Sequence, residues 1–369
     1  MRVGFDARWY NDSGVGSYVA GLLPALARAG CELVAYVDSN HPVPGLDALS
    51  VQIVPVNAGK YSPLASLEFR SRATQDKLDL FHSPFYVMPL LACPVIVTVH
   101  DLIPFLFPIY PWPKQEMVKA GYRLAARRAM HIIADSQQTA NDIQKILKVS
   151  PQRITAVQLA ASETFHSHAK EGELERLRQK FGVCQPYVVI ASARNWRTKN
   201  LEGALKAVTM ARKLANIDFQ TLVFGPPEGL EASSDHELQQ KLNMIRTGYL
   251  EAQELAALFR HAHAFVMPSL YEGFGLPLVE AMSCGCPVIT SNRGSLPEIA
   301  GAGAQCFDPL EISAMADALI ELLRSPVELE QRKSAALKKA ADFSWNKAAL
   351  ETMAVYHLLH GEFRCEKNR

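Results

Sequence analysis

The sequence predicts an α/β protein made of two doubly wound parallel-sheet domains that face a central cleft. Short apolar runs rich in Val and Ile alternate with longer helical stretches, which is typical of parallel sheets covered by helices on both faces. A chain of 369 residues is also too long for one ordinary hydrophobic core, so two domains are expected. Clefts between domains are preferred sites for small ligands.

The predicted strands fall into two sets, separated by a polar and charged segment. The first set covers residues 2–8, 33–37, 80–82, 95–99 and 132–135, and the second covers 187–191, 221–224, 264–267 and 288–290. We therefore expect a Rossmann-like domain over 1–165, a linker over 166–182, a second Rossmann-like domain over 183–345 and a terminal helix over 346–369.

Composition excludes several classes of protein. The net charge is only +1, from 38 basic and 37 acidic residues, so no nucleic-acid partner is expected. No apolar run approaches the ~20 residues of a membrane-spanning helix, and no apolar signal region precedes the first strand, so we expect a cytoplasmic protein. The seven cysteines lack metal-ligand spacing and are expected to be reduced.

Two carboxylates bracket a glycine turn that leads from a predicted strand into a helix. The turn holds Glu272, Gly273 and Gly275, and Pro277 suits the first turn of the helix. The free N–H groups and positive dipole end of such a helix bind anions, and the glycines allow a ligand to approach closely. Glu272 would then lie at the ligand, whereas Glu280, one turn into the helix, would reach back to a ribose diol. The alternative is that Glu272 only caps the helix and that Glu280 is a solvated surface residue.

This pair is one of several motifs with a shared order and spacing. The others are Gly14-Val-Gly16, the strand end His100-Asp101, Arg194 with Lys199-Asn200, and Phe343-Ser-Trp345 before the last helix. Together with the stretch 248–301 they resemble the family 4 glycosyltransferases, which have the GT-B fold, over nearly the full chain. The resemblance implies an acceptor-side first domain, a second domain that binds a nucleotide-sugar donor, and a terminal helix that crosses back to the first domain.

The resemblance assigns roles to the residues around the glycine turn. It implies that Glu272 acts catalytically at the reacting sugar, and that Phe274, Gly275, Leu276 and Glu280 bind the donor.

The glycines of the first domain are also expected to bind the donor. The resemblance implies that Gly14 and Gly16 lie there, with the backbone of Gly16 offered to the donor phosphate across the cleft. A dinucleotide fingerprint of an oxidoreductase is the alternative, because Asp38 ends the second strand. That pattern fits poorly, since its third small residue would fall at Val19.

Arg194 and Lys199 follow the strand 187–191. Two fixed cations would stabilise the charge that develops on a departing nucleoside diphosphate, as a metal ion does elsewhere. The chain has no Asp-x-Asp triplet of metal-dependent sugar transferases, so we expect no metal and no cofactor. Arg197 could serve in place of Arg194, and solvated surface cations are the alternative for the whole loop.

His100 ends the strand 95–99 at the edge expected to face the cleft. The resemblance implies a catalytic position, in which His100 contacts the transferred sugar and Asp101 orients the loop. A core imidazole with satisfied hydrogen bonds is the alternative. His82 has a similar placement after the strand 80–82 and is left outside the catalytic set.

A basic helical stripe of Lys119, Arg123, Arg127 and Arg128 follows the aromatic Trp112. It suggests peripheral contact with an anionic membrane, at the inner face where a lipid-linked acceptor would reside. A solvated helix face is the alternative.

The resemblance thus implies a metal-independent, retaining transferase that moves a hexose from a nucleotide sugar to a glycan or lipid-linked saccharide. The resemblance to bacterial surface-polysaccharide enzymes favours mannose from GDP-mannose. UDP-hexose or dTDP-deoxyhexose donors, and a non-catalytic scaffold that binds sugar nucleotides, remain open.

Overall fold

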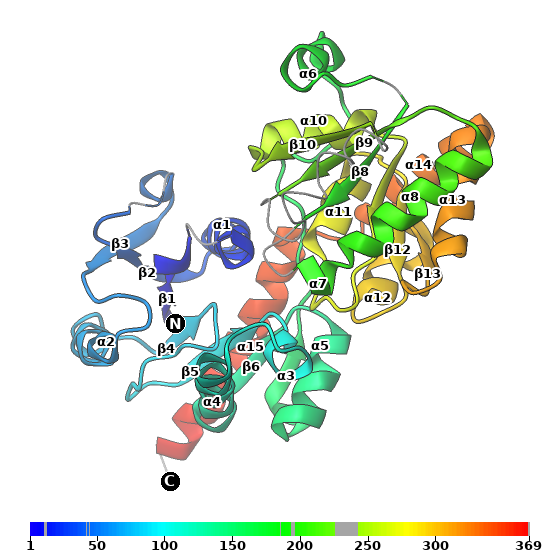
Figure 1. The fold of residues 1–369 in the computed structure, drawn as a ribbon. Coiled ribbons are helices and arrows are strands. Elements are labelled where there is room, and N and C mark those ends of the chain that lie inside the picture. The colour runs from blue at the N-terminus through cyan, green and yellow to red at the C-terminus, as the bar shows by residue number, and fades with distance from the viewer. Residues whose placement is uncertain are drawn as a thin grey trace. The chain divides into compact units, whose positions relative to one another are not determined.

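The computed structural model describes all residues except 11–12, 42, 44, 185, 193–195, 226–242 and 368–369. The chain divides into two compact units, shown in Figure 1. Unit 1 comprises Met1–Ala160 with Ser344–Arg369, and unit 2 comprises Ala161–Phe343. Each unit is a parallel sheet with helices on both faces.

The sheet of unit 1 has seven strands in the order β3-β2-β1-β4-β5-β6-β7, and every printed strand pair is parallel. The strands are β1 (Arg2–Asp6), β2 (Glu32–Asp38), β3 (Val51–Val56), β4 (Leu80–Ser83), β5 (Val95–Val99), β6 (His131–Ala134) and β7 (Ile154–Ala156). Because the order reverses between β1 and β4, this is the point where a doubly wound sheet opens a crevice at its carboxyl edge.

Helices cover both faces of this sheet. They are α1 (Ser13–Arg28), α2 (Pro63–Gln75), α3 (Ile103–Leu106), α4 (Trp112–Arg128), α5 (Gln137–Asp142) and α15 (Trp345–Lys367). On one face, Phe69 of α2 and Tyr122 of α4 pack in the same core as Phe81 of β4. On the other face lie α1 and α15, which are joined to the strands by hydrogen bonds.

The terminal helix α15 therefore belongs to unit 1. Its Tyr356 hydroxyl lies 2.6 Å from Nδ1 of His82, and Nε2 of His82 lies 2.8 Å from the Thr98 hydroxyl. Burial lowers the pKa of His82 to about 3, so this imidazole is neutral and joins the core network. At Gly21 of α1 an added Cβ would lie 2.0 Å from the Trp345 ring, so the glycine permits the close approach of α15.

The sheet of unit 2 repeats the same winding with six parallel strands, in the order β10-β9-β8-β11-β12-β13. The strands are β8 (Tyr187–Ala191), β9 (Gln220–Phe224), β10 (Met244–Gly248), β11 (Ala264–Met267), β12 (Val288–Ser291) and β13 (Gln305–Phe307). The order reverses between β8 and β11, so the loops after these two strands are the place to look for a ligand.

The helices of unit 2 are α6 (Glu173–Phe181), α7 (Trp196–Lys199), α8 (Leu201–Ala215), α10 (Ala252–His261), α11 (Leu276–Ser283), α12 (Leu296–Ala300), α13 (Ile312–Arg324) and α14 (Pro326–Ala340). Helices α8 and α13 share one apolar core with β8 and β11. Phe259 of α10 packs on Phe265 of β11 at a ring-centroid distance of 5.0 Å, which places α10 on the other face.

Part of the segment expected to be a linker is helical. Helix α6 lies within 166–182 and packs on α10, and the buried Glu173 carboxylate accepts hydrogen bonds from Arg260 at 2.7 and 2.8 Å. The polar composition of this segment therefore reflects a surface helix held by a buried ion pair. Within the described ranges, every helix is too short or too polar to span a lipid bilayer.

Candidate functional site

Two predicted site residues meet at the switch point of unit 2. Lys199 ends α7, in the connection that follows β8, and Glu272 lies in the loop after the neighbouring strand β11. The Lys199 Nζ lies 2.5 Å from Glu272 Oε1, and the two side chains are 21% and 10% exposed. The structure therefore brings together the cation and the carboxylate that the sequence placed at one ligand.

The backbone also joins these two loops. The amide of Leu270 donates to the carbonyl of Thr198 at 2.7 Å, so the residue before Lys199 is tied to the loop that carries Glu272. Arg194, the other predicted phosphate ligand, lies outside the described residues. Only the backbone of Arg197 is described, so the choice between the two arginines stays open.

A second turn, at Gly294 and Ser295, supports the loop that carries Glu272. The amide of Ser295 donates to the Glu272 carbonyl at 3.1 Å, and the Ser295 hydroxyl donates to the Phe274 carbonyl at 2.9 Å. Gly294 has φ +59°, and a Cβ there would lie 2.7 Å from the Glu272 carbonyl oxygen. Glycine is required for this contact, which fixes the position of the carboxylate.

The same contacts correct one local expectation. From its spacing, the segment Ser295-Leu-Pro-Glu298 predicts a capping box at the start of a helix. Helix α12 does begin at Leu296, but Ser295 makes no side-chain cap. Its hydroxyl binds the Phe274 carbonyl instead, because supporting the neighbouring loop competes for the same group.

Helix α11 begins directly at this loop. Gly275 precedes it with φ +95°, and a Cβ there would lie 2.8 Å from Leu296 Cδ2. Phe274 is buried against Phe343 at a ring-centroid distance of 5.9 Å, whereas Leu276 is half-buried at the first helical position. The first-turn N–H groups and positive dipole end of α11 provide a place for an anion beside Lys199.

Glu280 lies one turn into α11. Its side chain is half-buried, and among the described residues no side chain forms an ion pair or hydrogen bond with its carboxylate. Burial raises the pKa of Glu280 from 4.5 to about 7. A desolvated carboxyl without a partner is a feature of binding sites, where a ligand supplies the missing hydrogen bonds.

In unit 1, His100 follows β5 and is held on both sides of its ring. Nδ1 lies 2.7 Å from Asp135 Oδ2, and Nε2 lies 2.8 Å from the Pro84 carbonyl oxygen. Burial acts to lower the pKa of His100, but the charge and hydrogen bond of Asp135 and the bond to Pro84 outweigh it and raise the pKa. Both nitrogens therefore donate to acceptors of the protein, and the predicted contact with the sugar stays a prediction.

Asp135 was missed as a site residue in the sequence, where it ends the predicted strand 132–135. It is buried directly after β6, the strand next to β5. The sequence does contain a signal for Asp135. It is a carboxylate at the carboxyl end of a strand, and the neighbouring strand ends at His100.

The two glycines of α1 that the sequence placed at the donor, Gly14 and Gly16, differ in their surroundings. A Cβ at Gly16 would lie 2.3 Å from the Tyr10 carbonyl oxygen, whereas a Cβ at Gly14 would meet nothing within 4 Å. Packing therefore accounts for a glycine at position 16, because α1 approaches the turn after β1 closely there. The expected contact of either glycine with a donor phosphate stays a prediction.

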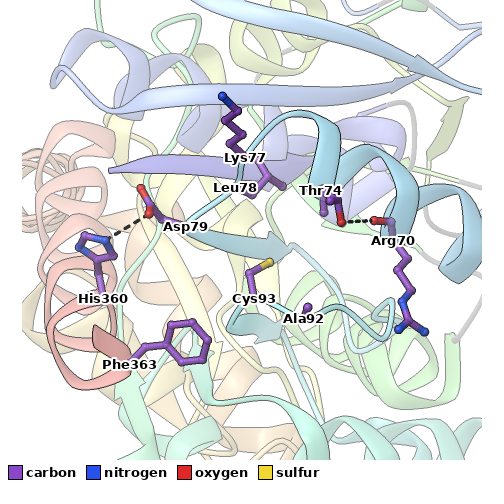
Figure 2. Close-up of a pocket in the computed structure, with 10 residues that line it drawn as sticks. Arg70, Thr74, Lys77, Leu78, Asp79, Ala92, Cys93, His360 and Phe363 are labelled. Carbon is purple, nitrogen blue, oxygen red and sulfur yellow. Dashed lines mark hydrogen bonds and ion pairs between the residues drawn. The ribbon is translucent and has the colours of Figure 1, made fainter. Parts of the chain in front are cut away.

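A cavity of about 300 Å³ lies at the amino-terminal edge of the unit 1 sheet, opposite the carboxyl edge that carries His100 (Figure 2). Its lining includes Asp79 directly before β4, Cys93 shortly before β5, and His360 of α15. None of the residues that line it is a predicted site residue. The chemistry predicted for this chain therefore lies at the carboxyl edges of the two sheets, not in this cavity.

Comparison with known protein families identifies the family of this chain. Residues 13–160 match the family described as Glycosyltransferase Family 4, and residues 175–341 match Glycosyl transferases group 1. The chain belongs to the family 4 glycosyltransferases. It is accordingly an enzyme that transfers a sugar.

Two curated relatives of this glycosyltransferase carry mannosyltransferase names. O-antigen chain mannosyltransferase B of Escherichia coli is 28% identical over 78% of this chain and 76% of its own length. MMP alpha-(1->4)-mannosyltransferase of Mycolicibacterium hassiacum is 31% identical over 66% of this chain. The match spans 59% of that second protein, which is less than two thirds of its length.

The fold of the glycosyltransferase is GT-B, with two Rossmann-like units in one chain. One similar solved structure is Anabaena HepE in complex with UDP-glucose, with a TM-score of 0.74 and 17% identity over 96% of this chain and all of that one. At this identity the likeness supports the fold alone.

The raised pKa of Glu280 predicts a pH-dependent cost to the ligand-free fold. The unfolded chain ionises this carboxyl at its ordinary pKa of 4.5, whereas the folded chain does so at about 7. The fold therefore loses stability as the pH rises through this window and carries the full cost above it. Glu280→Gln should raise the Tm at about pH 8 by roughly 2–8 °C, corresponding to about 1–2 kcal/mol, and by much less at about pH 5. Equal Tm differences at both pH values would show that Glu280 ionises normally.

Proposed function

We propose that this enzyme transfers mannose from GDP-mannose to a glycan or lipid-linked saccharide acceptor, with retention of configuration. The observation that carries the donor assignment is the Lys199–Glu272 pair beside the head of α11, at the switch point of unit 2. The mannosyltransferase names of the two relatives favour mannose, and GDP is its expected carrier.

In this proposal each group of the site meets one part of the donor. The N–H groups at the head of α11 and the ammonium of Lys199 bind the diphosphate, and stabilise its charge as the leaving group departs. Glu272 accepts hydrogen bonds from hydroxyls of the sugar. Glu280 accepts hydrogen bonds from the ribose diol. These bonds replace the hydrogen bonds to water that the carboxylate loses through burial.

The reaction exchanges one bond at the anomeric carbon for another on the same face of the sugar. The bond to the diphosphate oxygen breaks, and the acceptor hydroxyl oxygen bonds to the same carbon. The hydroxyl proton passes to the departing phosphate. Because the protein supplies fixed cationic groups at the phosphates, this proposal requires no metal ion.

Two alternatives lead to different results. A UDP-hexose or dTDP-deoxyhexose transferase would use the same phosphate groups but select another base. A non-catalytic scaffold would bind sugar nucleotide without turnover, so transfer of the sugar to an acceptor excludes it.

A nucleotide panel tests the donor assignment. GDP should raise the Tm of the enzyme more than UDP or dTDP does, because specific binding to the folded state stabilises it. Lys199→Ala should lower the turnover of GDP-mannose by about 100-fold or more, as expected for the loss of one preorganised cation. Lys338→Ala, an exposed lysine of α14, is the matched control and should change neither value.

Turnover should also persist in EDTA. A strict requirement for Mg²⁺, or stabilisation by UDP in preference to GDP, would contradict this assignment.

We further propose that unit 1 contacts an anionic membrane through α4. Lys119 and Arg123 of the expected stripe lie near Glu116, at 2.9 and 3.9 Å, so part of their charge is compensated. Arg127 and Arg128, in contrast, are exposed at the end of the helix. Leu124, 50% exposed, lies one turn before them, and Met117, 68% exposed, lies about two turns before Leu124. Trp112, 78% exposed, begins the same helix. An exposed apolar face flanked by cations suits an anionic leaflet.

Vesicle flotation tests the membrane contact. The enzyme should float with vesicles that contain anionic lipid, and less so at high salt, because screening weakens the attraction. The double variant Arg127→Glu with Arg128→Glu should lose this binding. Lys338→Glu with Lys347→Glu makes the same change in net charge on α14 and α15 and should retain it. Equal flotation with neutral and anionic vesicles would exclude the proposal.

A further inference from the structure

A row of aromatic rings runs along the carboxyl edge of unit 1, starting from His100. The Phe85 ring stacks on the His100 ring at a centroid distance of 6.3 Å, and the Trp9 ring lies 4.7 Å from Phe85. Tyr61 packs edge-on against Trp9 at 5.6 Å. These rings come from the segments that follow β5, β4, β1 and β3, so the sheet winding itself aligns them.

The far end of this row is open to solvent and the middle is buried. Tyr61 is 69% exposed, whereas Trp9 is 2% exposed beneath it. The ammonium of Lys60 lies 5.4 Å from the centre of the Trp9 ring. An exposed tyrosine on a buried tryptophan, with a lysine beside it, presents a flat aromatic surface and hydrogen-bond donors together.

The loop that carries Lys60 and Tyr61 is held in place by hydrogen bonds to charged side chains. Arg8 donates to both carboxylate oxygens of Asp6 at 2.8 and 2.7 Å, and its remaining Nη1 donates to the Ala58 carbonyl at 2.8 Å. The Glu68 carboxylate accepts from the amides of Asn57 and Ala58 at 3.3 and 3.0 Å. An exposed tyrosine on a loop fixed in this way is preorganised, so a ligand that binds to it orders little further.

We propose that Tyr61 and Lys60, which lie on the buried Trp9, form the subsite for the acceptor saccharide. The exposed Tyr61 ring packs against one face of a pyranose, where polarised C–H groups meet the negative face of the aromatic ring. Lys60 donates a hydrogen bond to a hydroxyl of the same sugar. This inference rests on the proposed transferase function, and it names an uncharged pyranose as the group that the acceptor presents.

Ligand-observed saturation-transfer NMR tests the subsite without catalysis. The probes are methyl α-mannopyranoside and methyl α-glucopyranoside, added to the enzyme with GDP. The wild type should transfer saturation to the ring protons of a probe, and Tyr61→Ala should reduce this transfer about 3- to 10-fold. Tyr61→Phe should retain the transfer, because the ring remains. Tyr249→Ala removes another exposed tyrosine, 71% exposed and in unit 2, and should retain it as well.

Kinetics give a second readout, with the methyl glycoside that binds serving as the acceptor. Tyr61→Ala should raise the KM for acceptor about 3- to 10-fold, the range expected for one aromatic contact, and leave GDP affinity unchanged. Transfer from the wild type to neither sugar, or undiminished transfer in Tyr61→Ala, would overturn the subsite. If GDP binds while neither sugar does, only the subsite fails. If a sugar binds while no nucleotide does, the donor assignment fails instead.

Discussion

The ion pair between Lys199 and Glu272 is the interaction on which the site depends. The winding of the second sheet makes β8 and β11 neighbours, so the connections that follow these strands meet at one point. A largely buried carboxylate is costly without a partner, and Lys199 supplies one in the ligand-free enzyme. The same lysine then stands beside the head of α11, where a diphosphate would bind. Gly294 and Ser295 keep the carboxylate in place from the other side.

The sheet of unit 1 has the same winding but carries different side chains at its carboxyl edge. Its carboxyl edge holds the His100 imidazole between Asp135 and the Pro84 carbonyl, followed by the row of aromatic rings that ends at Tyr61. The buried pair of Arg8 with Asp6 ties the end of β1 to the loop after β3. The two units thus share one sheet topology but present different chemistry: fixed charges and helix N–H groups in one, and aromatic surface in the other.

The central strands of both sheets could be predicted from the sequence, because strands buried on both faces appear as continuous apolar runs. The four strands that were missed are β3, β7, β10 and β13, which are the edges of the two sheets. Their half-exposed residues leave no such run, and only pairing with a neighbouring strand defines them. The motifs placed Lys199 and Glu272 at one ligand. The ion pair between them, the Asp135 contact and the role of Ser295 arise from contacts between distant segments, which no local pattern records.

Calorimetry of GDP binding to two glutamate variants tests the account most directly. Glu280→Gln should weaken binding of GDP by about 1–3 kcal/mol, because a charge-assisted hydrogen bond to the ribose is lost. Glu272→Gln should leave GDP affinity intact or raise it, since Lys199 no longer has a competing carboxylate, while kcat falls. A loss of GDP affinity in Glu272→Gln together with unchanged affinity in Glu280→Gln would contradict the assignment of the two carboxylates.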